Sequence, residues 1–233
     1  MNISIMGKNI AIDFHAHILP DMDHGCADLK MSIRQLDMAA REGIDIIIAS
    51  SHFYPHMETV ESFLSRREEA FRLLKEAGRT DKPLIKLGAE VLAYKNIDHM
   101  EGIERLCIEN SRVLLLEMPF MRQWEPKLVK SVVRLREEKG LEVILAHGER
   151  YPEAEVNKLL ARGFMLQLNA ASLACLLPTP SVRRYMREGR VAALGSDIHG
   201  LHKAYKEFAR ARRKWGRQAE QVLERSRRLL GIT

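Results

Sequence analysis

The sequence predicts an α/β fold in which about seven parallel strands form a distorted β/α barrel. Short runs rich in Val, Ile and Leu have the length of strands that are buried on both faces. Segments with apolar residues at helical spacing separate most of these runs, as expected when helices cover the sheet. The 233 residues are 46% hydrophobic, enough for one sizeable core, and no Pro/Gly/Ser-rich linker divides them. We therefore expect a single domain over residues 1–233.

The first strand is predicted at Asn9–His17, where apolar residues alternate with others and two histidines end the run. Successive side chains of a strand point to opposite faces, so Asp13, His15 and His17 are expected to share one face. Two imidazoles that converge at a strand end can hold a divalent metal ion. A histidine pair also occurs by chance at protein surfaces. The rest of the chain decides between a metal site and a chance pair.

The remaining elements follow in a regular order. After a loop at Pro20–Ala27, a helix is predicted at Asp28–Glu42, with Asp28 as its N-cap and Gly43 as its stop signal. A second amphipathic helix is predicted at Thr59–Ala77. Further strands are expected at the apolar runs Ile44–Ala49, Leu84–Ala89, Arg112–Met118, Glu142–Ala146, Phe164–Leu168 and Val191–Gly195.

Composition narrows the location of the protein. The longest apolar stretches, such as Ile44–Ala49, fall far short of the roughly 20 residues that a membrane-spanning helix needs. Met1–Lys8 lacks the apolar core and cleavage site of a secretory signal, so we expect a cytoplasmic protein. The three cysteines, Cys26, Cys107 and Cys175, show no metal-ligand spacing and are expected to be ordinary thiols.

Charge is concentrated near the C-terminus. The net charge is +6, yet Lys203–Arg228 alone holds ten basic and three acidic residues, a balance of +7. This segment is either a solvated helical face or a docking face for an acidic partner or an anionic membrane surface. Nucleic acid is not an expected partner, because interleaved aromatic residues and a recognised binding module are missing.

Metal-ligand residue types follow nearly every predicted strand. Active sites of parallel α/β barrels lie at the carboxyl ends of the strands. Six of the seven predicted strands end there in such residues: His15 and His17, His52, Glu90, Glu117, His147, and Asp197 with His199. Each residue alone has an ordinary explanation, such as a solvated acid or a helix cap. Together they predict a multinuclear metal centre, because random polar residues would not favour His, Asp and Glu at almost every strand end.

These strand ends also form recognisable motifs. They are the segments Ile12–Pro20, Ser50–His52, Gly88–Glu90, Leu116–Phe120, Ala146–Arg150 and Gly195–His199. In order and spacing they resemble the polymerase-and-histidinol-phosphatase (PHP) superfamily over nearly the whole chain. The Leu-Glu-Met-Pro-Phe and Ala-His-Gly-Glu-Arg stretches narrow the resemblance to the bacterial manganese-dependent protein-tyrosine phosphatases of capsule and exopolysaccharide systems.

The resemblance implies a PHP-type distorted barrel with two or three divalent metal ions. Manganese is expected, with zinc and iron as alternatives. One metal would be bound by His15, His17, Glu90 and Asp197. A second would share the bridging Glu90 and add Glu117 and His147. The third would use His52 and His199 together with the residue before a loop glycine, which is His24.

That last position departs from the relatives, which usually read Asp-Asp-Gly where this chain reads Asp23-His24-Gly25. A histidine ligand is neutral, so the third site would be less negative and would favour softer ions such as zinc or iron. In the competing interpretation, His24 points to solvent and Asp21 or Asp23 fills the position.

A second departure concerns phosphate binding. The relatives often carry an arginine in the loop after Asp197-x-His199, and this loop is shortened here. Lys203 would replace that arginine as a point charge, without bidentate geometry. Arg150 keeps the family's other phosphate-binding position, and His199 or a bound water would protonate the leaving group.

The implied activity is hydrolysis of phosphotyrosine in a protein, expected to be the tail of a bacterial tyrosine kinase that controls capsule or exopolysaccharide synthesis. No catalytic cysteine is required, and the cysteines lack the Cys-x5-Arg loop of thiol phosphatases. Two alternatives remain open. The chain is either a phosphatase of small phosphomonoesters such as histidinol phosphate, or a non-catalytic metal-binding module that docks a membrane-linked kinase through its basic C-terminal segment.

Overall fold

The computed structural model describes residues 10–201 and 203–232, and all strands that pair in its two sheets run parallel. One sheet has the order β1-β2-β4, made of Ile12–Ala16, Ile46–Ala49 and Leu84–Leu87. The other has the order β3-β5-β6-β7-β8-β9, made of His52–Phe53, Glu90–Leu92, Val113–Glu117, Glu142–Leu145, Met165–Asn169 and Val191–Gly195.

The two sheets form one barrel. β2 pairs with β4, and their continuations β3 and β5 pair with each other, so each of the two is a single strand bent in the middle. The nine short strands of the described residues therefore make seven barrel strands, two of them bent. The barrel closes where β9 returns to β1, through a bridge between Ala16 and Ile198 and a hydrogen bond of 2.7 Å from Asp197 N to His15 O. The predicted distorted β/α barrel is confirmed.

The bends correct the prediction of an unbroken strand at Leu84–Ala89. This strand is interrupted at Gly88, and Glu90 begins a new strand instead of following one. A Cβ atom at Gly88 would lie 3.2 Å from the Ile48 side chain, which explains a glycine at this close approach. Arg67 Nη1 donates to the Gly88 carbonyl oxygen at 3.1 Å, so the interruption leaves that acceptor satisfied.

The first strand is also less regular than predicted. Asn9 lies outside the described residues, and β1 covers Ile12–Ala16. Between Asp13 and Ala16 the register against β2 shifts, because β1 has one residue more than its partner over this stretch. Asp13, expected beside the two histidines, instead accepts hydrogen bonds from Ser196 N at 2.7 Å and Ser196 Oγ at 2.6 Å, which link β1 to the end of β9.

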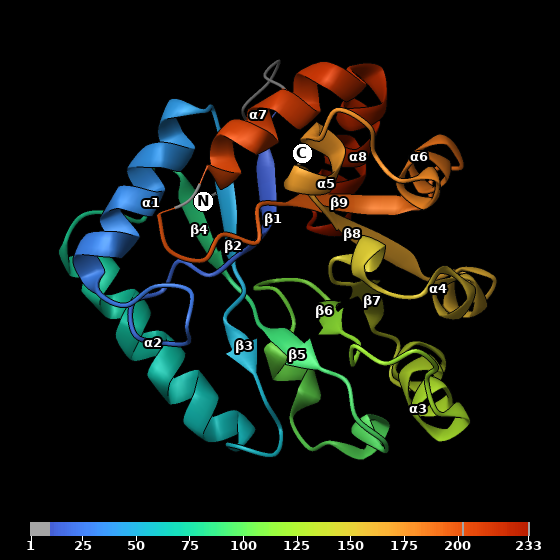
Figure 1. The fold of residues 1–233 in the computed structure, drawn as a ribbon. Helices are drawn as coiled ribbons and strands as arrows, with labels where there is room; N and C mark the ends of the chain where they lie inside the picture. The colour runs from blue at the N-terminus through green and yellow to red at the C-terminus, as the bar shows by residue number, and fades with distance from the viewer. Residues whose placement is uncertain (1–9, 202, 233) are drawn as a thin grey trace.

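Helices surround the strands (Figure 1). They are α1 Leu29–Arg41, α2 Val60–Glu76, α3 Pro126–Glu137, α4 Glu153–Leu160, α5 Ala170–Ala174, α6 Pro180–Arg187, α7 Ala204–Trp215 and α8 Arg217–Leu229, with short 3-10 turns at Ile97–His99, Ile103–Leu106 and Gly148–Arg150. The predicted N-cap of α1 is confirmed, because Asp28 Oδ1 accepts from Met31 N at 2.7 Å. No helix in the described part of the chain is both long and apolar enough to cross a membrane.

The core has two layers. A large cluster packs the outer surface of the barrel against the helices. A smaller cluster joins residues of β1, β2, β6, β7 and β9, among them Phe14, Ile48 and Leu115, and therefore fills the barrel interior. Leu230, which follows α8, belongs to the same inner cluster. The interior is thus apolar along most of the strands and becomes polar only at their carboxyl ends, where the candidate site lies.

Candidate metal centre

Two imidazoles at the end of β1 meet with their Nε2 atoms 3.0 Å apart. His15 Nδ1 donates to Gln167 Oε1 at 2.9 Å, and His17 Nδ1 donates to Asp23 Oδ2 at 2.8 Å. The identity of the Gln167 acceptor follows from the backbone N–H of His147, which can only donate and lies 2.7 Å from the same oxygen. Because both Nδ1 hydrogens are directed to these partners, the two Nε2 atoms face one buried space, where they can bind a cation.

Glu90 occupies the centre of the site. Its Oε1 lies 2.8 Å from His147 Nε2. Its Oε2 lies 3.0 Å from His52 Nδ1, 3.1 Å from His15 Nε2 and 3.3 Å from His17 Nε2. One fully buried carboxylate therefore stands between the β1 histidines on one side and His147 on the other, as a bridging ligand of two metal ions must.

Two further carboxylates flank Glu90. Asp197 Oδ1 lies 3.6 Å from His15 Nε2 and 3.5 Å from His17 Nε2, on the β1 side. Glu117 Oε1 lies 3.6 Å from His147 Nε2, on the opposite side. Asp197, two residues after the end of β9, adopts a left-handed φ of 50°. A non-glycine residue rarely adopts such a backbone, and here it accompanies a side chain directed into the site.

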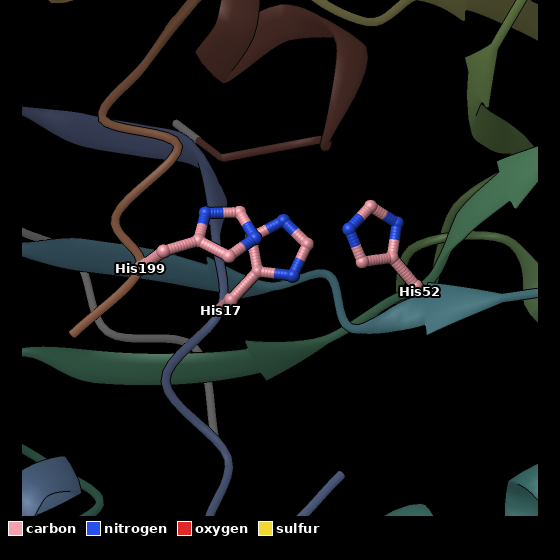
Figure 2. Close-up of side chains that lie close together, drawn as sticks. All are labelled: His17, His52 and His199. Atoms are coloured by element: carbon pink, nitrogen blue, oxygen red, sulfur yellow. The ribbon is translucent and has the colours of Figure 1, made fainter. Parts of the chain in front are cut away.

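A third group of imidazoles lies on the side of the cluster that faces solvent. Figure 2 shows the His17 ring between those of His199 and His52, with centroid distances of 4.1 Å and 4.5 Å. The exposed His24 ring stacks 4.5 Å from His199 and 5.0 Å from His52. His24 thus lies over the site, whereas Asp23 is engaged by its hydrogen bonds to His17 Nδ1 and His52 N.

The protonation of the cluster reflects its crowding. Burial and the neighbouring Glu90 raise the pKa of Glu117 to about 7. Burial lowers the pKa of His15, but the carboxylates of Glu90 and Asp197 outweigh it and raise that pKa to about 9. Without a metal, protons therefore balance the carboxylate charge. A divalent cation would replace those protons, so its affinity should fall as the pH falls.

The donor set fits a divalent metal. Thirteen buried side-chain atoms of the described residues have no hydrogen-bond partner, and four of them belong to this cluster: His52 Nδ1, Glu90 Oε2, His147 Nδ1 and His199 Nε2. Buried polar atoms are rarely left unpaired, so their concentration in one cluster fits a cation site. Three overlapping groups bring ligand atoms close enough to share an ion: His17 with His52 and His199, His15 with His17 and Asp197, and His52 with Glu90 and Glu117. Imidazole nitrogen with carboxylate oxygen suits manganese, iron or zinc.

A hydrogen-bond relay that the strand-end pattern did not predict supports these ligands. Gln167 Nε2 donates to Asn169 Oδ1 at 2.8 Å, and Asn169 Nδ2 donates to Asp197 Oδ2 at 2.8 Å. Gln167 Oε1 also accepts the hydrogen bond from His15 Nδ1. The relay therefore connects two candidate ligands, His15 on β1 and Asp197 after β9. Gln167 and Asn169 lie on β8, the one predicted strand without a metal-type ligand at its end. A Gln-x-Asn pair there was the available signal.

Of the two predicted phosphate-binding residues, Arg150 contacts the metal-ligand cluster and Lys203 does not in the described contacts. Arg150 Nη2 is 2.7 Å from Asp197 Oδ2, and its side chain is 46% exposed, so the guanidinium reaches from solvent to the edge of the cluster. Lys203 is exposed at the start of α7, and the described contacts do not join it to the cluster. Its assignment remains a prediction that rests on the shortened loop alone.

Comparison with known proteins agrees with this geometry. The family model described as "Capsular polysaccharide synthesis, CpsB/CapC" matches residues 11–226. The chain belongs to the CpsB/CapC family. It is 32% identical to the tyrosine-protein phosphatase YwqE of Bacillus subtilis (strain 168) over 170 residues, which cover 70% of this chain and 66%, just under two thirds, of YwqE. It is 26% identical to the tyrosine-protein phosphatase CpsB of Streptococcus agalactiae serotype III (strain NEM316), over 82% of this chain and 83% of CpsB.

A solved structure of the same CpsB/CapC relatives superimposes closely. It comes from work on YwqE from Bacillus subtilis and CpsB from Streptococcus pneumoniae, described as unique metal-dependent tyrosine phosphatases. The match has a TM-score of 0.78 and 25% sequence identity, and it covers 95% of each chain. The resemblance stated from the motifs is thereby confirmed.

Glu90→Gln should remove most of the metal-dependent stabilisation, because the centre loses its bridging charge. For the wild type, manganese at about 100 times its dissociation constant should stabilise the fold by about 2.7 kcal/mol. That corresponds to a rise in melting temperature of about 5–10 °C for a chain of this size. The exposed Glu101→Gln is the matched control and should keep the full shift. A Glu90→Gln protein with the wild-type manganese shift would contradict the bridging role.

Proposed function

We propose that the chain is a metal-dependent protein-tyrosine phosphatase that acts in capsule or exopolysaccharide synthesis. The observation that carries the proposal is the convergence of four imidazole nitrogens on the buried Glu90 carboxylate, in a member of the CpsB/CapC family. The curated relatives with this fold are tyrosine-protein phosphatases, and the superimposed structures are described as metal-dependent.

The ligand arrangement supports up to three metal ions, for which we propose manganese, with zinc or iron as alternatives. His15, His17, Glu90 and Asp197 would hold the first. Glu90, Glu117 and His147 would hold the second, and His52, His199 and His24 the third. When bound, such ions neutralise phosphoryl oxygens and supply a nucleophile from water at neutral pH.

Arg150 and His199 have separate tasks in this proposal. The guanidinium of Arg150 would exchange part of its ion pair with Asp197 Oδ2 for hydrogen bonds to phosphoryl oxygens. Its planar group of N–H donors matches the geometry of a phosphate. Burial lowers the pKa of His199 to about 4, so its ring is neutral at pH 7 and favours metal ligation over proton donation. A phenolate leaving group, with a pKa near 10, needs little help from an acid.

An exposed aromatic residue favours an aryl phosphate as substrate. Phe120 is 61% exposed, and its ring lies 5.6 Å from the His147 ring and 5.5 Å from the Tyr151 ring. A large apolar side chain is thus presented to solvent beside a candidate ligand. It would stack on the ring of a phosphotyrosine whose phosphate reaches the metal centre. The substrate in our proposal is a phosphotyrosine protein, the tail of a bacterial tyrosine kinase.

Activity on a phosphotyrosine peptide should require a divalent metal and survive thiol alkylation. Cys26 and Cys107 are buried, and the exposed Cys175 follows α5, outside the cluster. Treatment with chelator should abolish turnover, and manganese should restore it, whereas iodoacetamide should leave the rate within about two-fold. Full activity in protein shown to be metal-free would refute the proposal.

Phe120→Ala should raise KM for a phosphotyrosine peptide about ten-fold, since one aromatic stacking contact is worth about 1.5 kcal/mol. Hydrolysis of glycerol phosphate and the metal content should stay unchanged, and Phe120→Tyr should retain the wild-type KM. A wild-type protein that prefers glycerol phosphate would instead support the small-phosphomonoester alternative. A metal-loaded wild type that hydrolyses neither substrate would support the non-catalytic module.

His24→Asp should strengthen manganese binding at one site, because a carboxylate adds a negative charge where the chain has a neutral imidazole. His24→Ala should lose one metal ion and keep the pair that shares Glu90. His99→Ala, at a histidine with 70% side-chain exposure, is the control. Metal titrations of both His24 variants that overlay the wild type would show that His24 is not a ligand.

A further inference from the structure

Two adjacent leucines protrude from the segment between α5 and α6. Leu176 is 89% exposed and Leu177 is 77% exposed. The neighbouring Pro178 is buried, and Lys214 Nζ donates to the carbonyl oxygens of Cys175 and Leu176, the latter at 3.2 Å. The backbone that carries the leucines is therefore tied to α7, and it holds both side chains outward. Single exposed leucines are common, but an anchored pair forms an apolar tip.

A basic stripe runs along the exposed face of α7. Lys206, Arg210, Arg213 and Lys214 follow one another at i, i+4, i+7 and i+8, which places them on one side of the helix. The opposite side is buried through Phe208 and Ala211. Within the described residues, none of the four stripe side chains forms an ion pair. Arg212, outside the stripe, does pair, with Glu220 at 3.3 Å.

The helix on the other side of the tip is basic as well. Arg183 and Arg187, one turn apart on α6, are exposed and form no ion pair within the described part of the chain. Between them, Arg184 pairs with Glu153 at 2.9 Å. The apolar tip is thus flanked by two helices with unpaired cations. Figure 1 shows α5 beside α7 on the side of the barrel opposite α2 and α3.

We propose that the Leu176–Leu177 tip and the α7 stripe form a binding surface for an anionic lipid bilayer. The leucines would insert at the interface between headgroups and acyl chains, while the stripe contacts the headgroups. Lys214 joins the two parts, because it belongs to the stripe and holds the tip. An acidic protein would also use the charge, but two leucines that are 89% and 77% exposed protrude as insertion into a bilayer requires. The surface goes beyond the phosphatase function and does not depend on it.

The two parts of the surface should contribute separately. A basic side chain near an anionic bilayer increases partitioning about five-fold, so removal of two stripe charges should cost about 25-fold. Loss of both leucines should cost at least about ten-fold, from the apolar area that they would bury. The charge contribution should weaken with salt, whereas the contribution of the leucines should not.

Co-sedimentation of the full chain with vesicles tests the proposal. The wild type should bind vesicles that contain phosphatidylglycerol and not pure phosphatidylcholine. Arg210→Gln/Arg213→Gln and Leu176→Ser/Leu177→Ser should each lose binding by the stated factors while keeping the wild-type melting temperature. Lys127→Gln/Lys130→Gln on α3 removes the same charge at exposed lysines, and Met57→Ser removes an apolar side chain that is 72% exposed. Both controls should bind as the wild type does.

Three results would overturn the proposal. The first is wild-type protein that stays in the supernatant with phosphatidylglycerol vesicles at low salt. Binding to polyglutamate in that case would favour an acidic protein as the partner. The second is an equal loss of binding in the α3 control, which would reflect net charge alone. The third is undiminished binding of Leu176→Ser/Leu177→Ser, which would exclude insertion of the tip.

Discussion

The approach of two imidazole nitrogens at the end of β1 is the constraint on which the site depends. His15 Nε2 and His17 Nε2 lie 3.0 Å apart in a fully buried space, with their hydrogens directed to Gln167 and Asp23. Such lone pairs repel each other unless positive charge lies between them. In this structure, protons on the imidazoles supply that charge, because the carboxylates of Glu90 and Asp197 raise the pKa of His15 to about 9. A divalent cation would replace these protons. The partners of the Nδ1 atoms thereby orient the ligands before a metal binds.

The bent strands and the extra residue in β1 bring the candidate ligands together. Both bent strands are interrupted at the same level, so β3 and β5 begin side by side with His52 directly opposite Glu90 in register. The extra residue in β1 separates Asp13, which bonds to Ser196, from the two histidines. A regular barrel would have kept Asp13 on their face. The apolar cluster of the barrel interior lies below these irregular strand ends.

Much of the fold and of the site could be predicted from the sequence, and the limits have physical causes. Apolar runs mark buried strands, and parallel strands bring their carboxyl ends together, so His15, Glu117 and His147 could be placed in one site. Strand breaks at Gly88 could not be predicted, because a short apolar run reads the same whether it is straight or bent. The Gln167–Asn169 relay was missed for another reason. Amides take their roles from partners that are distant in sequence.

In the metal-bound protein, the lone pairs of His15 and His17 should face a metal ion rather than each other. A crystal structure grown with manganese, with anomalous scattering recorded at the manganese edge, tests this most directly. We expect an anomalous peak within coordination distance of both Nε2 atoms, at about 2.0–2.3 Å, and a second peak across Glu90, toward His147. Full manganese loading with no peak beside His15 and His17, and with their Nε2 atoms still in contact, would contradict it.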